Sequence, residues 1–533
     1  MLTVLRGTRP VSLPVEIVSV IPQRGAARHL IMIRLLPSAA NRVGLAQGMS
    51  GSPVYVNGRL IGAVSMGWGF SDHTTAMVMP IEDMIRVFSH SDNPRELMPS
   101  GLGSGGIMPE GTVRAASPIA VSGLSRRAVT DLQSVIGVPL EVAPFGAHGE
   151  LPLDYSRFSP GEALSVFLAW GDVEMSSLGT VTATSGDGRF LAFGHPFLER
   201  GAVNFPVARA TVHDMIFSQV FPFKIASPIA MVGTATQDRA GGVGRRMGFF
   251  TPSIAAKLVF RDMDADRRVE KNFRVVPDAF LGARLLAGIY SGLIDEQWGR
   301  RGEGTATVTL RVEGRDLLRG WTRTNMFFSG TDIGSAAVRE SAAIIDTIML
   351  QPFKDIYPIG FRLDVSITSE PRILFIEDVV VQEEAAPGDT LEIEVTLRRW
   401  RRDPVKKRFE LTIPEDATGN CELIVRGGGM HSLSQVALDG GWKSIEDFGR
   451  LLTEMNAADA NNELILELVH DRVDRRSGNR RAGAELTQEE QEFLSETKSR
   501  RIEEGTLRIA RSEYVVDGLM RRFINLIECD DDE

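Results

Sequence analysis

The sequence predicts a mainly β protein built from several domains. Glycines and prolines are frequent, at 53 and 26 of 533 residues, and short alternating apolar runs lie between turn residues. A single hydrophobic core stops growing at roughly 250–300 residues, so this chain is too long for one. We therefore expect about two to four domains.

Residues 1–90 form the first predicted β unit. Strands are expected over 15–20 and 29–36, followed by a hairpin with strands over 54–56 and 59–64. The hairpin is predicted because Asn57-Gly58 separates its strands, and this pair readily adopts the positive φ angles of a type I′ turn. A short helix over 80–88 is expected to close the unit.

The next two segments differ in residue composition and in the pattern of apolar residues. Residues 91–160 are rich in Gly, Pro and Ser, which indicates an insert or linker with one helix over 125–136. A second β unit is expected over 161–300. Its predicted strands are 163–170, 179–184 and 190–193, with a tight turn at Gly186-Asp187-Gly188 before the last of them.

Three further regions are expected after residue 300. Residues 301–370 read as mixed α/β with a helix over 335–349, and residues 371–430 as a small β-sandwich with strands over 391–397 and 408–413. Residues 431–533 are predicted to be a charged, helical extension. Ser444 with Asp447, and Thr487 with Glu490, have the spacing of helix capping boxes.

Composition excludes several classes of protein. The chain has 59 Lys and Arg against 69 Asp and Glu, a net charge of −10, which disfavours a general nucleic-acid binder. Cys421 and Cys529 lie far apart, so neither a disulfide framework nor a Cys-rich metal site is expected. No run of 18 apolar residues predicts a membrane span, and the sequence that begins at Met1 has no signal-peptide pattern.

The segment Gly48-Met49-Ser50-Gly51-Ser52-Pro53 is the sharpest local motif. A serine nucleophile needs small neighbours, because the backbone must turn tightly and present the amides of Gly48 and Ser50 to a developing oxyanion. The alternative is a glycine-rich turn in which Ser50 bonds its own backbone. A partner base would decide between them.

His195 is the best candidate for that base. It follows a predicted strand within Phe193-Gly194-His195-Pro196-Phe197, where the glycine and the proline fix the loop, and a general base must be held in place. The alternative is a half-buried histidine bonded to a backbone carbonyl. The histidines show no metal-ligand spacing, so no metal and no cofactor are expected.

Together the two segments resemble a known family. GMSGSPVYVNGRLIGAV, beginning at Gly48, and GTVTATSGDGRFLAFGHPF, beginning at Gly179, are similar to the SpoIVB-type serine peptidases. The resemblance is close over about residues 1–250 and looser to about 430. It implies Ser50 as nucleophile and His195 as base, on a trypsin-like pair of β-barrels. The serine segment precedes the histidine, so the two barrel halves are expected in permuted order.

The third catalytic residue stays open. The position where the family's proposed acid precedes the nucleophile reads Leu35-Leu36-Pro37 here, without a carboxylate. Asp238 and Asp187 are the two replacements. We prefer Asp238, because a Gly-Asp-Gly hairpin tip uses an aspartate such as Asp187 for the turn itself. A Ser-His dyad is the remaining reading.

The predicted function is a serine endopeptidase that cleaves a protein or peptide substrate. Ser52 is the alternative nucleophile. A catalytically silent, envelope-associated binding or adhesion module is the alternative function, and a protease that awaits a ligand or partner is a third. The basic run from Arg398 to Arg408 is either an exposed hairpin or, within the C-terminal region, a docking site for an anionic envelope partner. The resemblance implies a bacterial, exported or cell-envelope location.

Overall fold

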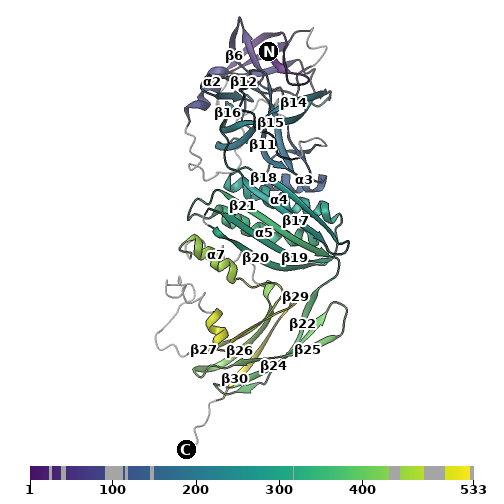
Figure 1. The fold of residues 1–533 in the computed structure, drawn as a ribbon, viewed down its shortest axis with the longest axis vertical. Coiled ribbons are helices and arrows are strands. Elements are labelled where there is room, and N and C mark those ends of the chain that lie inside the picture. Colours follow the sequence, from purple (N-terminus) through teal and green to yellow (C-terminus); the bar gives the residue numbers. More distant parts are fainter. Residues whose placement is uncertain are drawn as a thin grey trace, which may run out of the picture. The chain divides into compact units, whose positions relative to one another are not determined.

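The computed structural model describes residues 1–22, 27–37, 44–90, 112–114, 118–143, 149–315, 317–430, 445–472 and 498–527. The chain divides into two compact units. Unit 1 comprises residues 1–257, 271–296 and 357–361, and unit 2 comprises 258–270, 297–356 and 362–533. Both are built largely from strands (Figure 1), which confirms the mainly β prediction.

The first sheet of unit 1 carries the predicted hairpin. Its order is β3-β4-β7-β6-β5, and β8 also pairs with β6. Asn57 and Gly58 have φ angles of 50° and 76° at the β5–β6 turn, as a type I′ turn requires. The elements are β3 (Val15–Pro22), β4 (His29–Leu35), β5 (Pro53–Val56), β6 (Arg59–Trp68), β7 (Thr75–Pro80), β8 (Thr112–Arg114), α2 (Ile81–Ile85) and η1 (Arg86–Ser89), with β1 (Leu2–Val4) and β2 (Pro10–Ser12) as a separate pair.

Six antiparallel strands of unit 1 close on themselves. The ladder runs β12-β13-β16-β15-β14-β11, and β11 pairs back onto β12. Register shifts interrupt the long β14–β15 ladder, and such bulges let strands curl into a ring. The six are β11 (Ala163–Gly171), β12 (Glu174–Thr184), β13 (Arg189–Ala192), β14 (Gly201–Ile216), β15 (Phe223–Arg239) and β16 (Gly242–Met247); β9 (Ile119–Ser122) and β10 (Leu140–Val142) extend the sheet from β12.

Two helices pack together in unit 1. Helix α3 (Arg126–Ile136) begins where predicted, and the Ser125 hydroxyl caps it by accepting from the Ala128 N–H. Helix α4 (Ala279–Trp298) is not anticipated by the sequence reading, because its glycines lower helix propensity. Those glycines serve close packing instead: a Cβ on Gly288 would lie 2.2 Å from a methyl of Leu132 on α3.

Unit 2 contains a helix-covered hairpin. Strands β19 (Gly304–Gly314) and β20 (Leu317–Ser329) pair along their length, and α5 (Ile333–Leu350) packs against both. This helix confirms the one predicted over 335–349, and the Asp332 side chain caps it. Strands β17 (Ile254–Asp262), β18 (Arg267–Val275) and β21 (Ile359–Thr368) carry the chain between the two units.

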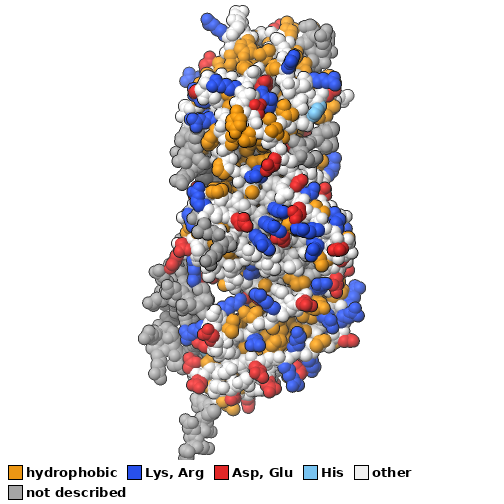
Figure 2. Space-filling view, in the orientation of Figure 1, with side chains coloured by type: hydrophobic (Ala, Val, Ile, Leu, Met, Phe, Trp, Pro, Cys, Tyr) orange, Lys and Arg blue, Asp and Glu red, His pale blue; other side chains and the backbone are white. Residues whose placement is uncertain are grey.

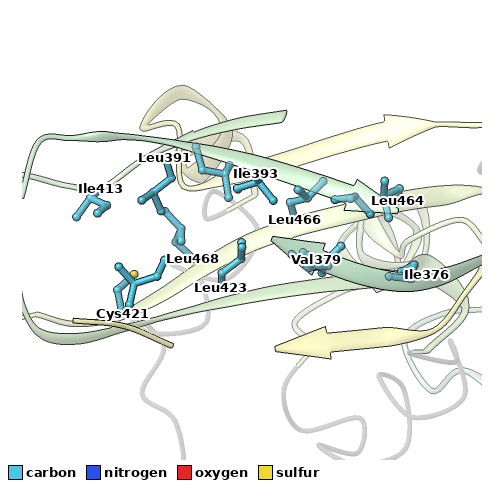
Figure 3. Packing of buried hydrophobic residues seen from close by; sticks show 14 of the residues in the cluster. Ile376, Val379, Leu391, Ile393, Ile413, Cys421, Leu423, Leu464, Leu466 and Leu468 are labelled. Atoms are coloured by element: carbon cyan, nitrogen blue, oxygen red, sulfur yellow. The ribbon is translucent and has the colours of Figure 1, made fainter. Parts of the chain in front are cut away.

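Two further sheets of unit 2, in its described part, form a β-sandwich. One sheet has the order β25-β24-β22-β29 and the other β23-β30-β26-β27-β28. Alternating aliphatic side chains such as Ile393 and Leu466 meet between them (Figure 3). The strands are β22 (Ile373–Val380), β23 (Glu384–Ala385), β24 (Thr390–Arg399), β25 (Pro404–Thr412), β26 (Ala417–Gly427), β27 (Glu463–Arg472), β28 (Leu507–Arg511), β29 (Val515–Asp517) and β30 (Leu519–Leu526).

The prediction for the C-terminal region needs revision. The helical extension over 431–533 is not confirmed: its described residues include α7 (Phe448–Ala457) but also β27, β28, β29 and β30. The period-two pattern of Leu464, Leu466 and Leu468 explains the strand, since these residues face the sandwich core. Asp447 caps α7, whereas Ser444 and the Thr487–Glu490 box lie outside the described residues.

The topology supports only part of the prediction of a permuted pair of β-barrels. The strands from 163 to 247 close into a ring, but the sheet of β3 to β8 is open in its described part. The double-barrel arrangement therefore stays a prediction. None of the helices in the described ranges has the length and apolar character that crossing a bilayer requires.

Candidate active site

Ser50 lies in a tight turn immediately before β5. Gly48 and Gly51 on either side of it both have φ near +87°, a conformation that favours glycine. The Ser50 side chain is buried, with 0% of its residue surface exposed. Among the described residues none bonds its hydroxyl oxygen, so the expected alternative of a serine bonded to its own turn is not what the structure contains.

The backbone of this turn leaves two N–H groups unused. The N–H groups of Met49, Gly51 and Ser52 donate to Ala46, Val64 and Met49 respectively. Within the described parts of the chain, no acceptor bonds the N–H of Gly48 or of Ser50. A trypsin-like oxyanion hole uses this same pair, the nucleophile's own N–H and that of the residue two positions before it.

Fixed carbonyls set the direction of both unused groups. The Gln47 carbonyl accepts from the Lys224 N–H at 3.1 Å, and the Met49 carbonyl accepts from the Ser52 N–H at 2.9 Å. Because a trans peptide directs its N–H opposite to its C=O, these bonds also orient the N–H groups of Gly48 and Ser50. The turn is therefore held in one arrangement with both donors available.

The Ser50 turn packs directly on the ring that carries His195. The Ser50 carbonyl accepts from the Thr180 N–H of β12 at 2.8 Å. A Cβ on Gly51 would lie 2.0 Å from the Thr180 carbonyl oxygen and 2.5 Å from the Phe193 nitrogen. Only glycine permits this approach, which explains why the motif needs Gly51.

His195 follows β13 in a loop with an unusual backbone. Phe193 and Gly194 both have positive φ, 72° and 65°, and such a value is rare for a bulky residue. The Phe193 ring stacks on the His195 imidazole, with centroids 5.6 Å apart and planes 10° from parallel. His195 itself is 3% exposed, so packing fixes the ring in place.

The two ring nitrogens of His195 have different surroundings. Nδ1 lies 2.7 Å from the carbonyl oxygen of Pro196. With the proton on Nδ1, that nitrogen donates to the carbonyl, and Nε2 carries the lone pair that a general base uses. A carbonyl thus stands where a catalytic triad has its carboxylate.

One backbone carbonyl links the serine turn to the histidine loop. The Val64 oxygen on β6 accepts from the Gly51 N–H at 2.7 Å. A Cβ on Gly194 would lie 3.0 Å from the same oxygen. The residues next to Ser50 and His195 therefore meet at one atom, although 145 positions separate the two side chains in the sequence.

Asp238, near the end of β15, holds the loop that follows His195. Its buried carboxylate accepts from the backbone N–H groups of Phe197 and Leu198 at 2.7 Å each, and from Arg200 at 3.2 Å. Three such bonds hold a carboxylate firmly in a buried position. The structure therefore places Asp238 at the loop that follows His195, where its carboxylate hydrogen-bonds the loop backbone.

Sequence reasoning missed Lys224 at the start of β15. Its buried ammonium donates to the Thr3 hydroxyl at 2.8 Å and to the Gly48 carbonyl at 3.3 Å. Burial lowers the pKa of Lys224 from 10.5 to about 7. Its signal in the sequence is a single lysine within Phe221-Pro-Phe-Lys-Ile225, an otherwise apolar strand start.

The remaining candidates lie elsewhere or serve other roles. Asp187 sits at a hairpin tip, where the Ser185 hydroxyl, and then the Arg189 side chain and N–H, lower its pKa. Ser52 is buried next to the Ser50 turn, and no described residue bonds its hydroxyl. Cys421 faces the sandwich core, as expected of a small apolar residue, and burial raises its pKa to about 11.

The basic run forms the β24–β25 hairpin of unit 2. Arg398 pairs with Glu377, and Lys406 pairs with Glu394 at 2.7 Å. Figure 2 shows basic and acidic side chains interspersed over unit 2 on the face in view. These pairs favour the exposed-hairpin interpretation over a docking site for an anionic partner.

Comparison with protein families gives a match in the N-terminal part of the chain. Residues 1–85 match the SpoIVB peptidase S55 family, a range that includes Gly48 to Pro53 and ends before His195 and Asp238. The match supports the resemblance to SpoIVB-type serine peptidases. Searches of curated proteins and of solved structures found nothing similar to the chain.

Proposed function

We propose that the protein is a SpoIVB-type serine endopeptidase with Ser50 as nucleophile and His195 as general base. The observation that carries the proposal is the buried Ser50 hydroxyl beside the unused N–H groups of Gly48 and Ser50. Leaving polar groups buried without partners costs stability, so such an arrangement is typical of a site built for a ligand or a reaction.

The chemistry follows the acyl-transfer pattern. Ser50 Oγ attacks the scissile carbonyl while His195 Nε2 takes its proton, and the N–H groups of Gly48 and Ser50 stabilise the oxyanion. His195 then returns the proton to the leaving amine. Water hydrolyses the resulting acyl-enzyme by the same steps in reverse, so the serine and the histidine are regenerated.

Two groups take the part of a triad acid in this proposal. The Pro196 carbonyl, 2.7 Å from Nδ1, selects the tautomer in which Nε2 is basic. Asp238 acts one step away, since its three backbone bonds fix the loop from Phe197 to Arg200. We therefore propose a Ser-His pair with Asp238 as a positioning residue.

The burial of Ser50 and His195 bears on regulation. Their residues are 0% and 3% exposed, so a protein substrate has to displace covering residues before attack. This supports the view that a ligand or partner opens the site. The location at the bacterial cell envelope is part of the same proposal, and family resemblance alone supports it.

Covalent labelling tests the assignment. A fluorophosphonate probe should label the wild-type chain, and Ser50→Ala and His195→Ala should each lower the labelling rate at least about 10³-fold. Ser52→Ala is the matched control, because its hydroxyl is equally buried two positions away. Each variant should keep the wild-type circular dichroism spectrum.

Retained labelling in Ser50→Ala would contradict the assignment. Loss of labelling in Ser52→Ala, with Ser50→Ala unaffected, would transfer the nucleophile to Ser52. A small probe needs less displacement of covering residues than a protein substrate does, so if the wild-type chain resists it even after prolonged incubation, the catalytic proposal itself fails.

A further inference from the structure

We infer that Lys224 is a positioning residue for the Ser50 turn. It stabilises the turn by donating a hydrogen bond to the Gly48 carbonyl. The inference deepens the proposed peptidase function and rests on it. Lys224 touches neither the hydroxyl of Ser50 nor the two unused N–H groups through any hydrogen bond described above, so its effect on the reaction is indirect.

Lys224 donates hydrogen bonds to two consecutive peptide groups of the turn. Its backbone N–H donates to the Gln47 carbonyl at 3.1 Å, and its ammonium donates to the Gly48 carbonyl at 3.3 Å. The first bond orients the Gly48 N–H, which is one of the two oxyanion donors. The second fixes the next peptide, Gly48–Met49, which lies one residue before Ser50.

A second strand supports the same carbonyl. The Thr180 hydroxyl of β12 donates to the Gly48 oxygen at 2.9 Å. Lys224 stands on β15, so two separate strands of the ring converge on one atom of the turn. Two donors on one carbonyl oppose rotation of the Gly48–Met49 peptide, a motion that would redirect the turn.

The lysine is costly for the fold at this position. Its side chain is buried, and no carboxylate in the described part of the chain lies within ion-pair distance of its ammonium. Thr3, Gly48 and the surrounding backbone face it instead, and burial is the cause of its lowered pKa. A buried lysine without a counter-ion destabilises a protein, so a role at the neighbouring site accounts for it better than stability does.

The test removes each donor in turn. Lys224→Met keeps the length of the side chain and the backbone N–H to Gln47, and Thr180→Val keeps the volume of Thr180. Lys257→Met, on strand β17, is the matched control for loss of a lysine. Fluorophosphonate labelling gives the maximal rate and the probe concentration at half-maximal rate for each variant.

We expect Lys224→Met to lower the maximal labelling rate roughly 10- to 100-fold, with the half-maximal concentration changed less than about threefold. Thr180→Val should lower the rate less. The double variant should lose clearly less than the product of the two single losses, because both side chains act on one carbonyl. Lys257→Met should label at the wild-type rate.

A second measurement is independent of activity. Hydrogen exchange followed by mass spectrometry should show faster exchange in the peptide that contains residues 45–52 for Lys224→Met and Thr180→Val, and no change for Lys257→Met. Unchanged exchange there, or wild-type labelling rates in both site variants, would overturn the inference. Failure of Lys224→Met to fold leaves Thr180→Val to decide by the same readouts.

The two proposals fail in different ways. An unlabelled wild-type chain with the expected exchange changes would remove the peptidase function and leave Lys224 as a support of the turn. A labelled wild-type chain whose rate ignores both substitutions would remove the role of Lys224 and keep the function.

Discussion

Buried polar groups around the Ser50 turn of unit 1 and around two arginines of unit 2 have contrasting surroundings. In unit 1, the Lys224 ammonium has no carboxylate partner among the described residues, and none of them bonds the hydroxyls of Ser50 or Ser52. In unit 2, the Arg323 guanidinium binds Glu340 at 2.8 Å and two backbone carbonyls. Arg426 likewise lies 2.9 Å from both Asp459 and Glu467.

Under the proposed function, this difference separates a turn that serves the reaction from an ion pair that serves stability. Buried groups that have hydrogen-bond partners stabilise one packing, as around Arg323 in unit 2. Buried groups without partners raise the free energy of the fold, and the cost persists only where another requirement demands it. Removing an unpartnered group near Ser50 and removing a partner of a paired group in unit 2 should therefore change stability with opposite signs.

The largest effect is expected from Lys224→Met in unit 1. The pKa of Lys224 falls from 10.5 to about 7 on folding, so the unfolded chain binds more protons between these values. Wild-type stability therefore rises with pH across this window, by up to about 5 kcal/mol from Lys224 alone. The variant lacks this rise and should be the more stable protein at pH 7 and below.

Urea unfolding of the full chain at several pH values measures this effect. The stability gain of Lys224→Met over wild type should be greatest near pH 7 and should vanish near pH 10.5. A gain in stability that stays constant across the pH range, or a loss of stability at neutral pH, would show that burial does not lower the pKa of Lys224.

A smaller effect of opposite sign is expected from Glu340→Ala in unit 2. The change leaves Arg323, whose side chain is 7% exposed, without its carboxylate and removes the partner of the Asn325 amide. Stability should fall by about 3 kcal/mol. The matched control is Glu454→Ala on α7, which breaks a half-exposed pair with Arg450 and should cost at most about 0.5 kcal/mol.

Fluorophosphonate labelling should be the same in wild type and Glu340→Ala at a temperature where both are folded. If Glu340→Ala and Glu454→Ala lower the free energy of unfolding equally, burial does not increase the contribution of the Arg323–Glu340 pair to stability.

The smallest pair of effects concerns two buried hydroxyls. Ser52→Ala in unit 1 removes an oxygen that no described residue bonds, so stability should be unchanged or rise by up to about 1 kcal/mol. Thr305→Val in unit 2 removes a hydroxyl that donates to the Glu370 carbonyl at 2.7 Å and accepts from the Arg372 N–H at 2.8 Å. It should cost about 1–2 kcal/mol. Thermal unfolding compares the two, and a cost in both would break the contrast between the units.

Local features of the fold were predictable from sequence, and long-range ones were not. Asn57-Gly58 predicts a hairpin turn and Ser125 predicts a helix start, because a turn or a helix cap depends on only a few neighbouring residues. Helix α4 escaped prediction because Gly288 and Gly292 are unfavourable locally and gain their value only against α3. The strands after residue 460 were missed because charged residues between them obscured the period-two pattern.

The candidate site divides in the same way. Ser50 and His195 stand out because glycines flank them within short motifs, whereas Lys224 carries no motif and lies 174 positions from Ser50. Its place beside Gly48 depends on the pairing of β15 with the turn, which only the folded ring supplies. The role of Asp238 likewise depends on backbone bonds that no side-chain pattern encodes.

The Val64 carbonyl has a consequence for how such a site varies among related sequences. Because it meets the serine turn and the histidine loop through its main-chain oxygen, any residue that suits the buried interior of β6 can occupy position 64. Gly51 and Gly194 have no such freedom, since a side chain on either would push the two segments apart. Related sequences should therefore vary at position 64 and keep glycine at the other two, so that the spacing of Ser50 and His195 is maintained by main-chain atoms that substitution does not alter.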